Sequence, residues 1–209
     1  MNCQAVFSDA DGTLLNSLHR FEPHTLECIR FLQGRGIPFV IVSARSPRGV
    51  ESILRRYDFR CPIIAFSGGL ILDEERRVLS HRGLKRETVR EILDFLSARR
   101  FDLAWCLYSL DQWIVADRSD PRVLQEESDV EIRSTPGTLS DIQDDQINKI
   151  LCLCAPGIIG TVERELKAAF PQCSIAQSSS LLLEIMAPGV NTLTNVPNIS
   201  DVHVMGKVL

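Results

Sequence analysis

The stretch CQAVFSDADGTLL, which runs from Cys3 to Leu15, is the most informative part of this sequence. Its first half, Cys3–Ser8, is short and largely apolar, and a polar turn follows it directly. Short apolar runs that end in turn residues are typical of strands buried on both faces of a sheet. The carboxylates of Asp9 and Asp11 are two residues apart, which places both on one face of an extended segment. The stretch therefore predicts a buried strand that ends in a pair of acidic side chains.

The same pattern, an apolar strand followed by a polar turn, recurs twice. The two apolar runs are Ile37–Val42 and Cys61–Phe66. Amphipathic helices are predicted between the strands, one at about 23–35 and one that begins after Ser46, its expected N-cap. This alternation indicates an α/β fold with a parallel, Rossmann-like sheet. The polar turns then meet at the carboxyl ends of the strands, where open α/β sheets bind their ligands. These turns comprise residues 9–13, 43–46 and 67–69.

The segment 85–186 has a different order of elements and predicts a second, inserted α+β domain. It opens with a helix and two strands and closes with another helix and two strands, so the same unit begins and ends it. The predicted helices cover 85–100, 121–127, 139–142 and 158–170, and the predicted strands cover 103–108, 112–116, 129–133, 148–154, 173–177 and 181–186. We therefore expect a core made of residues 1–84 and 187–209, with residues 85–186 inserted into it.

The paired carboxylates favour a bound cation and acid–base chemistry. Asp9 and Asp11 would repel each other if both pointed into one pocket, and a cation would relieve that repulsion. A nucleophilic carboxylate, with a second carboxyl group acting as acid and base, is sufficient to transfer a phosphoryl group. A calcium-binding loop also begins with D-x-D-G, but it requires a Glu at its twelfth position, which is Arg20 here. The calcium interpretation is therefore rejected.

Composition limits the compartment and the partners. The chain has 209 residues and a net charge of −4, and no block of Lys and Arg stands out, which disfavours a nucleic-acid or membrane surface. No secretory signal or membrane-spanning run is found, and the seven cysteines are irregularly spaced, so a cytoplasmic protein is expected.

Cys152 and Cys154 form a C-x-C. We favour buried strand cysteines over a metal site because no partner pair with zinc-site spacing lies nearby.

Taken together, the motifs resemble the haloacid dehalogenase (HAD) superfamily of phosphatases, and within it the Cof-like subfamily. The run DADGTLL at 9–15 is similar to the first motif, and IVSAR at 41–45 is similar to the second. FSGG at 66–69 resembles the loop after the third strand, where Asn-Gly is more usual. The inserted segment 85–186 matches the subfamily's larger cap in position and element order. The resemblance covers roughly residues 3–190.

The resemblance implies a Mg²⁺-dependent phosphatase that hydrolyses small phosphorylated metabolites, such as sugar phosphates, through an aspartyl-phosphate. Asp9 would be the nucleophile and Asp11 the general acid and base. Both would hold Mg²⁺, Asp9 through its side chain and Asp11 through its backbone carbonyl. Ser43 would hydrogen-bond a phosphoryl oxygen, or else be a turn serine. The further expected residues are Gly12 and Ala44 for phosphate binding, and Ser67, Gly68, Gly69 and Arg45 for the substrate loop, with Arg45 as a loop or cap contact.

The resemblance stops at Asn191. The subfamily has a Lys after Gly-Val-Ser/Asn, but here Gly189-Val190-Asn191 is followed by Thr192. A fourth, acidic motif has no counterpart, since Asp201 is the only acidic residue of the tail and Lys207 its only basic one. We therefore expect an impaired activity, because a cation beside the nucleophile is missing. We also expect a truncated, frame-shifted or divergent C-terminus.

The missing elements would affect the sheet as well. The subfamily places two further strands beside the first strand, so the core is expected to be incomplete, with residues 3–8 at an open edge. Residues 201–209 could supply one replacement strand, although Asp201 would then lie at the wrong end for the site. Two alternatives remain open: a non-catalytic HAD-fold protein that at most binds a phosphorylated ligand, and a phosphomutase, which shares the first two motifs.

Overall fold

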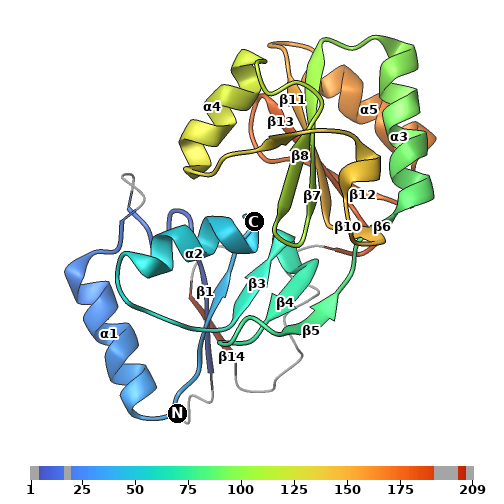
Figure 1. Ribbon diagram of the computed structural model, residues 1–209. Coiled ribbons are helices and arrows are strands. Elements are labelled where there is room, and N and C mark those ends of the chain that lie inside the picture. The colour runs from blue at the N-terminus through green and yellow to red at the C-terminus, as the bar shows by residue number, and fades with distance from the viewer. Residues whose placement is uncertain (1–4, 17–19, 191–201, 206–209) are drawn as a thin grey trace. The chain divides into compact units, whose positions relative to one another are not determined.

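The computed structural model describes residues 5–16, 20–190 and 202–205. The chain divides into two compact units, one of residues 1–81 with 191–209 and the other of residues 82–190 (Figure 1). The expected inserted domain, 85–186, lies within the second unit. Each unit has a six-stranded sheet of its own.

The first unit is built on a mixed sheet with the strand order β14-β1-β2-β3-β4-β5. Four neighbouring strands are parallel: β14 (Val202–Met205), β1 (Ala5–Asp9), β2 (Phe39–Val42) and β3 (Ile63–Ala65). β4 (Leu70–Leu72) and β5 (Val78–His81) continue the sheet as an antiparallel hairpin. Every residue of β2 and β3 is buried, which confirms the prediction of parallel strands covered on both faces.

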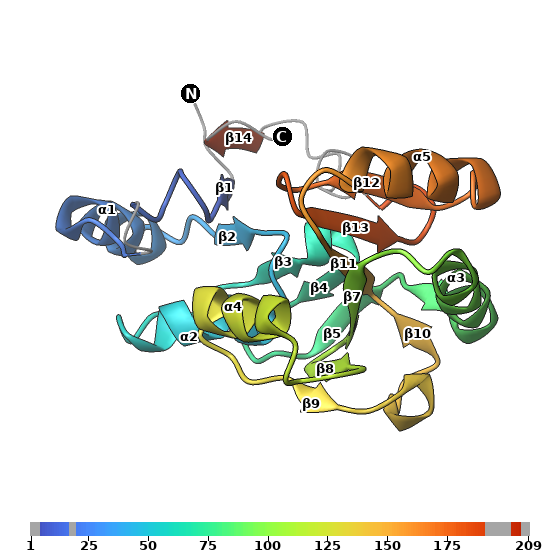
Figure 2. The same ribbon diagram turned by 90° about the horizontal axis from the view of Figure 1, so that it is seen from above.

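Two helices connect the first three strands. α1 (Pro23–Gly34) joins β1 to β2, and α2 (Pro47–Arg55) joins β2 to β3. Both lie on the same side of the sheet (Figures 1 and 2), as expected when two crossovers of the same hand run in the same direction. The Ser46 side chain accepts a hydrogen bond of 3.3 Å from the Gly49 backbone N–H, which confirms the predicted N-cap of α2.

The strand expected near the C-terminus is present. β14 pairs in parallel with β1, from Ala5 opposite Val202 to Ser8 opposite Met205. β1 therefore has a partner on both sides, and the expected open edge at this strand is wrong. β14 begins beside Ala5, at the end of β1 that is remote from Asp9. The expectation for Asp201 lies outside the described residues.

The second unit has the strand order β12-β13-β11-β7-β8-β9. Its elements are α3 (Arg86–Arg99), β7 (Leu103–Ser109), β8 (Gln112–Val115), α4 (Pro121–Val130), β9 (Thr135–Pro136), β11 (Lys149–Cys154), α5 (Ile159–Ala169), β12 (Ser174–Gln177) and β13 (Leu182–Met186). A separate ladder joins β6 (Leu84–Lys85) to β10 (Gln146–Ile147). Helices α3 and α5 cover one face of the sheet and α4 lies on the other (Figure 1). The predicted repeat of a helix followed by two strands is confirmed.

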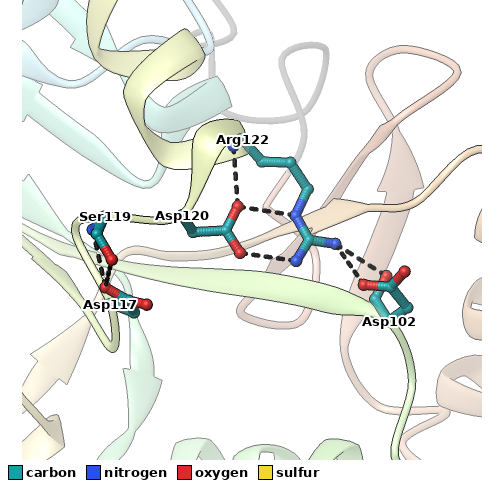
Figure 3. A network of polar contacts seen from close by, with 5 residues as sticks. All are labelled: Asp102, Asp117, Ser119, Asp120 and Arg122. Atoms are coloured by element: carbon teal, nitrogen blue, oxygen red, sulfur yellow. Dashed lines mark hydrogen bonds and ion pairs between the residues drawn. The ribbon is translucent and has the colours of Figure 1, made fainter.

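A charged network holds the start of α4 (Figure 3). Asp120 is the N-cap and accepts a hydrogen bond of 2.9 Å from the Arg122 backbone. The Arg122 guanidinium donates hydrogen bonds to both Asp120 carboxylate oxygens, at 3.0 and 2.7 Å, and to the Asp102 carboxylate at 2.9 Å. In the same loop, Asp117 accepts two hydrogen bonds from Ser119. The network ties α4 to the segment that precedes β7.

One predicted element is wrong. Residues 129–133 are predicted as a strand, but α4 continues to Val130 and Glu131 ends it in the left-handed conformation, with φ of 55°. The alternation of Val130 and Ile132 resembles that of a strand. The helix prevails because α4 is already formed at this point, and adding residues to an existing helix costs little free energy. The two-residue strands β6, β9 and β10 were not predicted, because they are too short to show a period. The predicted short helix at 139–142 is the 3₁₀ helix η2 (Leu139–Asp141).

The C-x-C cysteines are buried in β11. Cys152 and Cys154 belong to the hydrophobic core of the second unit, which confirms the interpretation as strand cysteines. Burial raises the pKa of Cys154 to about 11 and also raises that of Cys152, so both remain thiols, which are poor metal ligands. Among the described residues, no group of three or more His, Cys, Asp and Glu could hold a metal ion. No helix in the described part of the chain is long and apolar enough to cross a membrane.

Candidate active site

The ends of β1 and β2 bring the first two candidate residues together. Asp9 is the last residue of β1 and lies opposite Val42, the last residue of β2. The Ala10 N–H donates to the Val42 carbonyl at 3.2 Å, which extends the pairing beyond Asp9. Ser43 follows immediately and is 2% exposed. The nucleophile expected at Asp9 and the phosphate ligand expected at Ser43 therefore lie at adjacent strand ends.

The loop after β3 is tied to the loop after β2 by two backbone hydrogen bonds. The Ser67 N–H donates to the Ser43 carbonyl at 3.0 Å, and the Phe66 N–H donates to the Arg45 carbonyl at 3.0 Å. These bonds require an unusual backbone. Phe66 and Ser67, in the 3₁₀ turn η1 (Phe66–Gly68), have φ of 49° and 53°. Positive φ in residues other than glycine is strained and is concentrated at functional sites.

Asp11 lies in the turn beyond β1 and is bound by Arg45. The Arg45 Nε donates to Asp11 Oδ2 at 2.8 Å, and Nη2 donates to Oδ1 at 2.9 Å. Gly12 follows with φ of 74°, the left-handed conformation that this turn requires and that glycine adopts without strain. The expected pairing of Asp9 and Asp11 in one pocket did not anticipate this ion pair. The sequence does contain a signal for this ion pair. Asp11 follows β1 and Arg45 follows the adjacent strand β2, and the two side chains carry opposite charges.

Burial and charge both act on Asp9. The side chain is half-buried, and desolvation raises the pKa of Asp9 above its ordinary value. The negative charge of Asp11 adds to this rise, while a hydrogen bond from the Ala10 N–H lowers the pKa. A cation beside Asp9 would therefore be stabilising. Asp9 could offer a carboxylate oxygen and Asp11 its backbone carbonyl, which fits Mg²⁺, an ion that usually takes one or two protein oxygens and completes its shell with water and phosphate.

The remaining candidates border this centre. The Arg45 backbone N–H donates to the Ser43 Oγ at 3.1 Å. Because that oxygen is the acceptor, the Ser43 hydroxyl hydrogen can still be donated to a ligand. Ala44 is exposed between Ser43 and Arg45, and Gly12 is also exposed. Gly68 and Gly69 complete the turn after β3, in which the Gly69 N–H bonds to the Phe66 carbonyl at 2.9 Å.

All of these candidates belong to the first unit. The structure brings together Asp9, Asp11, Gly12, Ser43, Ala44, Arg45, Ser67, Gly68 and Gly69 at the carboxyl ends of β1, β2 and β3. Thr192, Asp201 and Lys207, on which the expectation of impairment depends, lie outside the described residues. A half-buried carboxylate, a second carboxylate and a serine hydroxyl at one edge of a parallel sheet suit nucleophilic and acid–base chemistry on an anionic group.

The class of protein follows from this arrangement: an α/β core with aspartates at the end of its first strand and an α+β unit inserted after β5. Residues 6–202 match the model of the haloacid dehalogenase-like hydrolase family. A Haemophilus influenzae protein that bears the name of a phosphatase is 32% identical over 186 residues, which is 89% of this chain and 70% of the relative. The chain belongs to the HAD superfamily and to its Cof-like subfamily.

Two further comparisons agree with this assignment. The 5-amino-6-(5-phospho-D-ribitylamino)uracil phosphatase of Bacillus subtilis is 33% identical over 99 residues, which is 47% of this chain and 33% of that protein. The crystal structure of a haloacid dehalogenase-like hydrolase from Bacteroides thetaiotaomicron superposes with a TM-score of 0.84 at 24% identity, over 99% of this chain and 82% of the other. At that identity the structural likeness shows the fold alone.

Proposed function

We propose that this protein is a Mg²⁺-dependent phosphatase of small phosphorylated metabolites, such as sugar phosphates, that acts through an aspartyl-phosphate. The observation that carries the proposal is the position of Asp9, half-buried at the end of β1 beside Asp11 and next to the buried Ser43. The phosphatase names of the Haemophilus and Bacillus relatives support the reaction class. The ribityl phosphate in the name of the Bacillus enzyme supports a sugar-like substrate.

The reaction takes place in two steps. In the first, an Asp9 carboxylate oxygen attacks phosphorus, the bond between phosphorus and the leaving oxygen breaks, and that oxygen takes a proton from the Asp11 carboxyl group. In the second, a water molecule gives a proton to the Asp11 carboxylate, the water oxygen attacks phosphorus, and the bond between phosphorus and the Asp9 oxygen breaks. The second step releases inorganic phosphate and restores the Asp9 carboxylate.

The surrounding residues hold the phosphoryl group. The Ser43 hydroxyl donates to a phosphoryl oxygen, and the backbone at Gly12 and Ala44 borders the same group. Ser67, Gly68 and Gly69 form the neighbouring substrate loop, and Arg45 lies beside it. Mg²⁺, held by the Asp9 carboxylate and the Asp11 carbonyl, would neutralise charge on the phosphoryl oxygens.

The proposal includes a reduced rate. Thr192 stands where the subfamily has a Lys, and the loss of one such electrostatic contact costs on the order of 10²–10³ in rate. Thr192→Lys is therefore expected to raise kcat. If that variant were no faster than the parent, the explanation through the missing Lys would be wrong. The second candidate function is a non-catalytic protein that binds a phosphorylated ligand, and it rests on the same substitution.

The test is phosphate release from a panel of sugar phosphates with Mg²⁺. Asp9→Asn is expected to lower the rate by on the order of 10³-fold or more, and chelation of Mg²⁺ is expected to abolish it. Asp94→Asn, at an exposed position on α3, is the matched control and should keep the parent rate. Equal rates for the parent and Asp9→Asn would exclude the nucleophile. Calorimetric binding of a sugar phosphate without turnover would favour the non-catalytic alternative.

A further inference from the structure

The guanidinium of Arg45 holds both oxygens of Asp11. The two hydrogen bonds, 2.8 Å from Nε and 2.9 Å from Nη2, form a parallel pair. The Arg45 side chain is 15% exposed and that of Asp11 is 44% exposed. A bidentate pair of this kind fixes the plane and direction of a carboxylate, which a single point charge cannot do.

Arg45 is itself held from three directions. Its backbone N–H donates to Ser43 Oγ and its carbonyl accepts from the Phe66 N–H, so the loops after β2 and β3 fix its main chain. Its side-chain stem lies against Gly49 in the first turn of α2. A Cβ on Gly49 would lie 3.3 Å from the Arg45 Cβ and 3.7 Å from its Cδ. The guanidinium therefore extends from a rigid base.

Asp11 is joined to its own segment by an isolated backbone bridge to Leu15. It lies two residues beyond the last residue of β1, at an exposed position, and Gly12 follows it with positive φ. A general acid must lie within hydrogen-bond reach of the leaving oxygen, and small errors in its position are costly. The bidentate contact on its carboxylate comes from Arg45, at the adjacent strand end.

We propose that Arg45 is the positioning residue for Asp11, a role that rests on the proposed phosphatase function. Arg45 aims the Asp11 carboxyl group at the leaving oxygen and acts on the reaction only through Asp11. Both Asp11 oxygens are engaged by Arg45 in this structure. When substrate binds, one of the two bonds is released, and the freed Asp11 oxygen takes a proton from water and donates it to the leaving oxygen. The other bond keeps the carboxyl group aligned.

The test compares two leaving groups. A nitrophenolate departs without a proton, whereas the alkoxide of a sugar phosphate needs one from Asp11. For Arg45→Gln we expect kcat/KM to fall by about 10²-fold on the best sugar phosphate of the panel, and by less than about 5-fold on p-nitrophenyl phosphate. KM should change little. Arg45→Lys keeps the positive charge but cannot make the bidentate contact, so it should recover part of the loss. Arg55→Gln, at an exposed position on α2, is the matched control and should behave like the parent.

A second comparison isolates the route through Asp11. On the Asp11→Asn background, Arg45→Gln should cause little further loss, because the group that it positions is already disabled. A further loss as large as in the parent would overturn the proposal. Equal losses on the two substrates would also overturn it, because a structural or substrate-binding role affects both alike. A raised KM with unchanged kcat would reassign Arg45 to substrate binding.

One readout needs no turnover. In a crystal structure of Arg45→Gln, we expect the Asp11 carboxylate to leave the position that it has beside Arg45. An unchanged Asp11 conformation would contradict the proposal even in an inactive protein. Failure of the phosphatase function is recognised separately, by equal rates for the parent and Asp9→Asn.

Discussion

Glu127 accepts two hydrogen bonds from the Arg118 guanidinium, 2.8 Å from Nε and 2.7 Å from Nη2. The same carboxylate accepts from the Ser134 N–H at 2.8 Å and from its hydroxyl at 2.6 Å. One acidic side chain of α4 thus connects the loop before the helix to the chain that follows it. The two partners, Arg118 first and then Ser134, lower the pKa of Glu127 to about 2.

We predict that Glu127→Gln lowers the free energy of unfolding by about 1–2 kcal/mol at pH 7. A carboxylate whose folded pKa is depressed contributes stability above its unfolded value of 4.5, and loses it as the pH falls toward about 2. The difference between parent and variant should therefore shrink as the pH is lowered from 5 to 3 in urea titrations. Asp94→Asn is the control. If the stability difference between parent and Glu127→Gln stayed constant with pH, the charge of Glu127 would not be the cause of the lost stability.

A buried ion pair lies in the sheet of the second unit. The Lys149 Nζ is 3.0 Å from Glu184 Oε1, the two side chains are 8% and 10% exposed, and the Tyr108 ring centroid is 5.4 Å from Nζ. Lys149→Met leaves a buried, uncompensated carboxylate, so we predict a loss of about 3 kcal/mol in the free energy of unfolding.

The double variant Lys149→Met with Glu184→Leu tests the cause. Replacement of both partners removes the unpaired charge, so most of the loss should be recovered in denaturant titrations. Losses that simply add in the double variant would indicate packing rather than charge.

The N-cap of α2 gives a smaller effect. Ser46→Ala removes the bond to the Gly49 N–H, and we predict a loss of about 1 kcal/mol in the free energy of unfolding. Ser46→Asp supplies another capping oxygen and should restore the parent midpoint in thermal unfolding. If Ala and Asp behaved alike, the cap would not be the reason for the change.

Sequence periodicity was sufficient for the core strands and most helices. The apolar runs that contain β1, β2 and β3 and the cap at Ser46 follow from local rules of burial and hydrogen bonding. The predicted strand at 129–133 was wrong because its short alternation competes with a helix that is already formed. At the site, the rule that the carboxyl ends of parallel strands lie at one edge of the sheet predicted that Asp9 and Ser43 would lie close together. It could not predict the Arg45–Asp11 pair, because a bidentate contact depends on side-chain direction as well as strand order.

The ladder between β6 and β10 gives the sharpest steric prediction. At Gly83, an added Cβ would lie 2.8 Å from the Ile147 carbonyl oxygen and 2.9 Å from the Gln146 Cβ, closer than side-chain carbons approach. The Gly83 N–H also donates to Gln146 Oε1 at 2.8 Å. Gly83→Ala must therefore push β10 away, and we predict a loss of about 1–3 kcal/mol in the free energy of unfolding.

Gly160→Ala is the matched control for Gly83→Ala. Gly160 lies in α5, and an added Cβ there meets nothing within 4 Å. Because alanine favours a helix over glycine by about 1 kcal/mol, this variant should be as stable as the parent or more stable. Amide hydrogen exchange should show faster exchange at β6 and β10 in Gly83→Ala and unchanged exchange there in Gly160→Ala. Parent-like protection of β10 in Gly83→Ala would mean that the ladder absorbs the methyl group without moving.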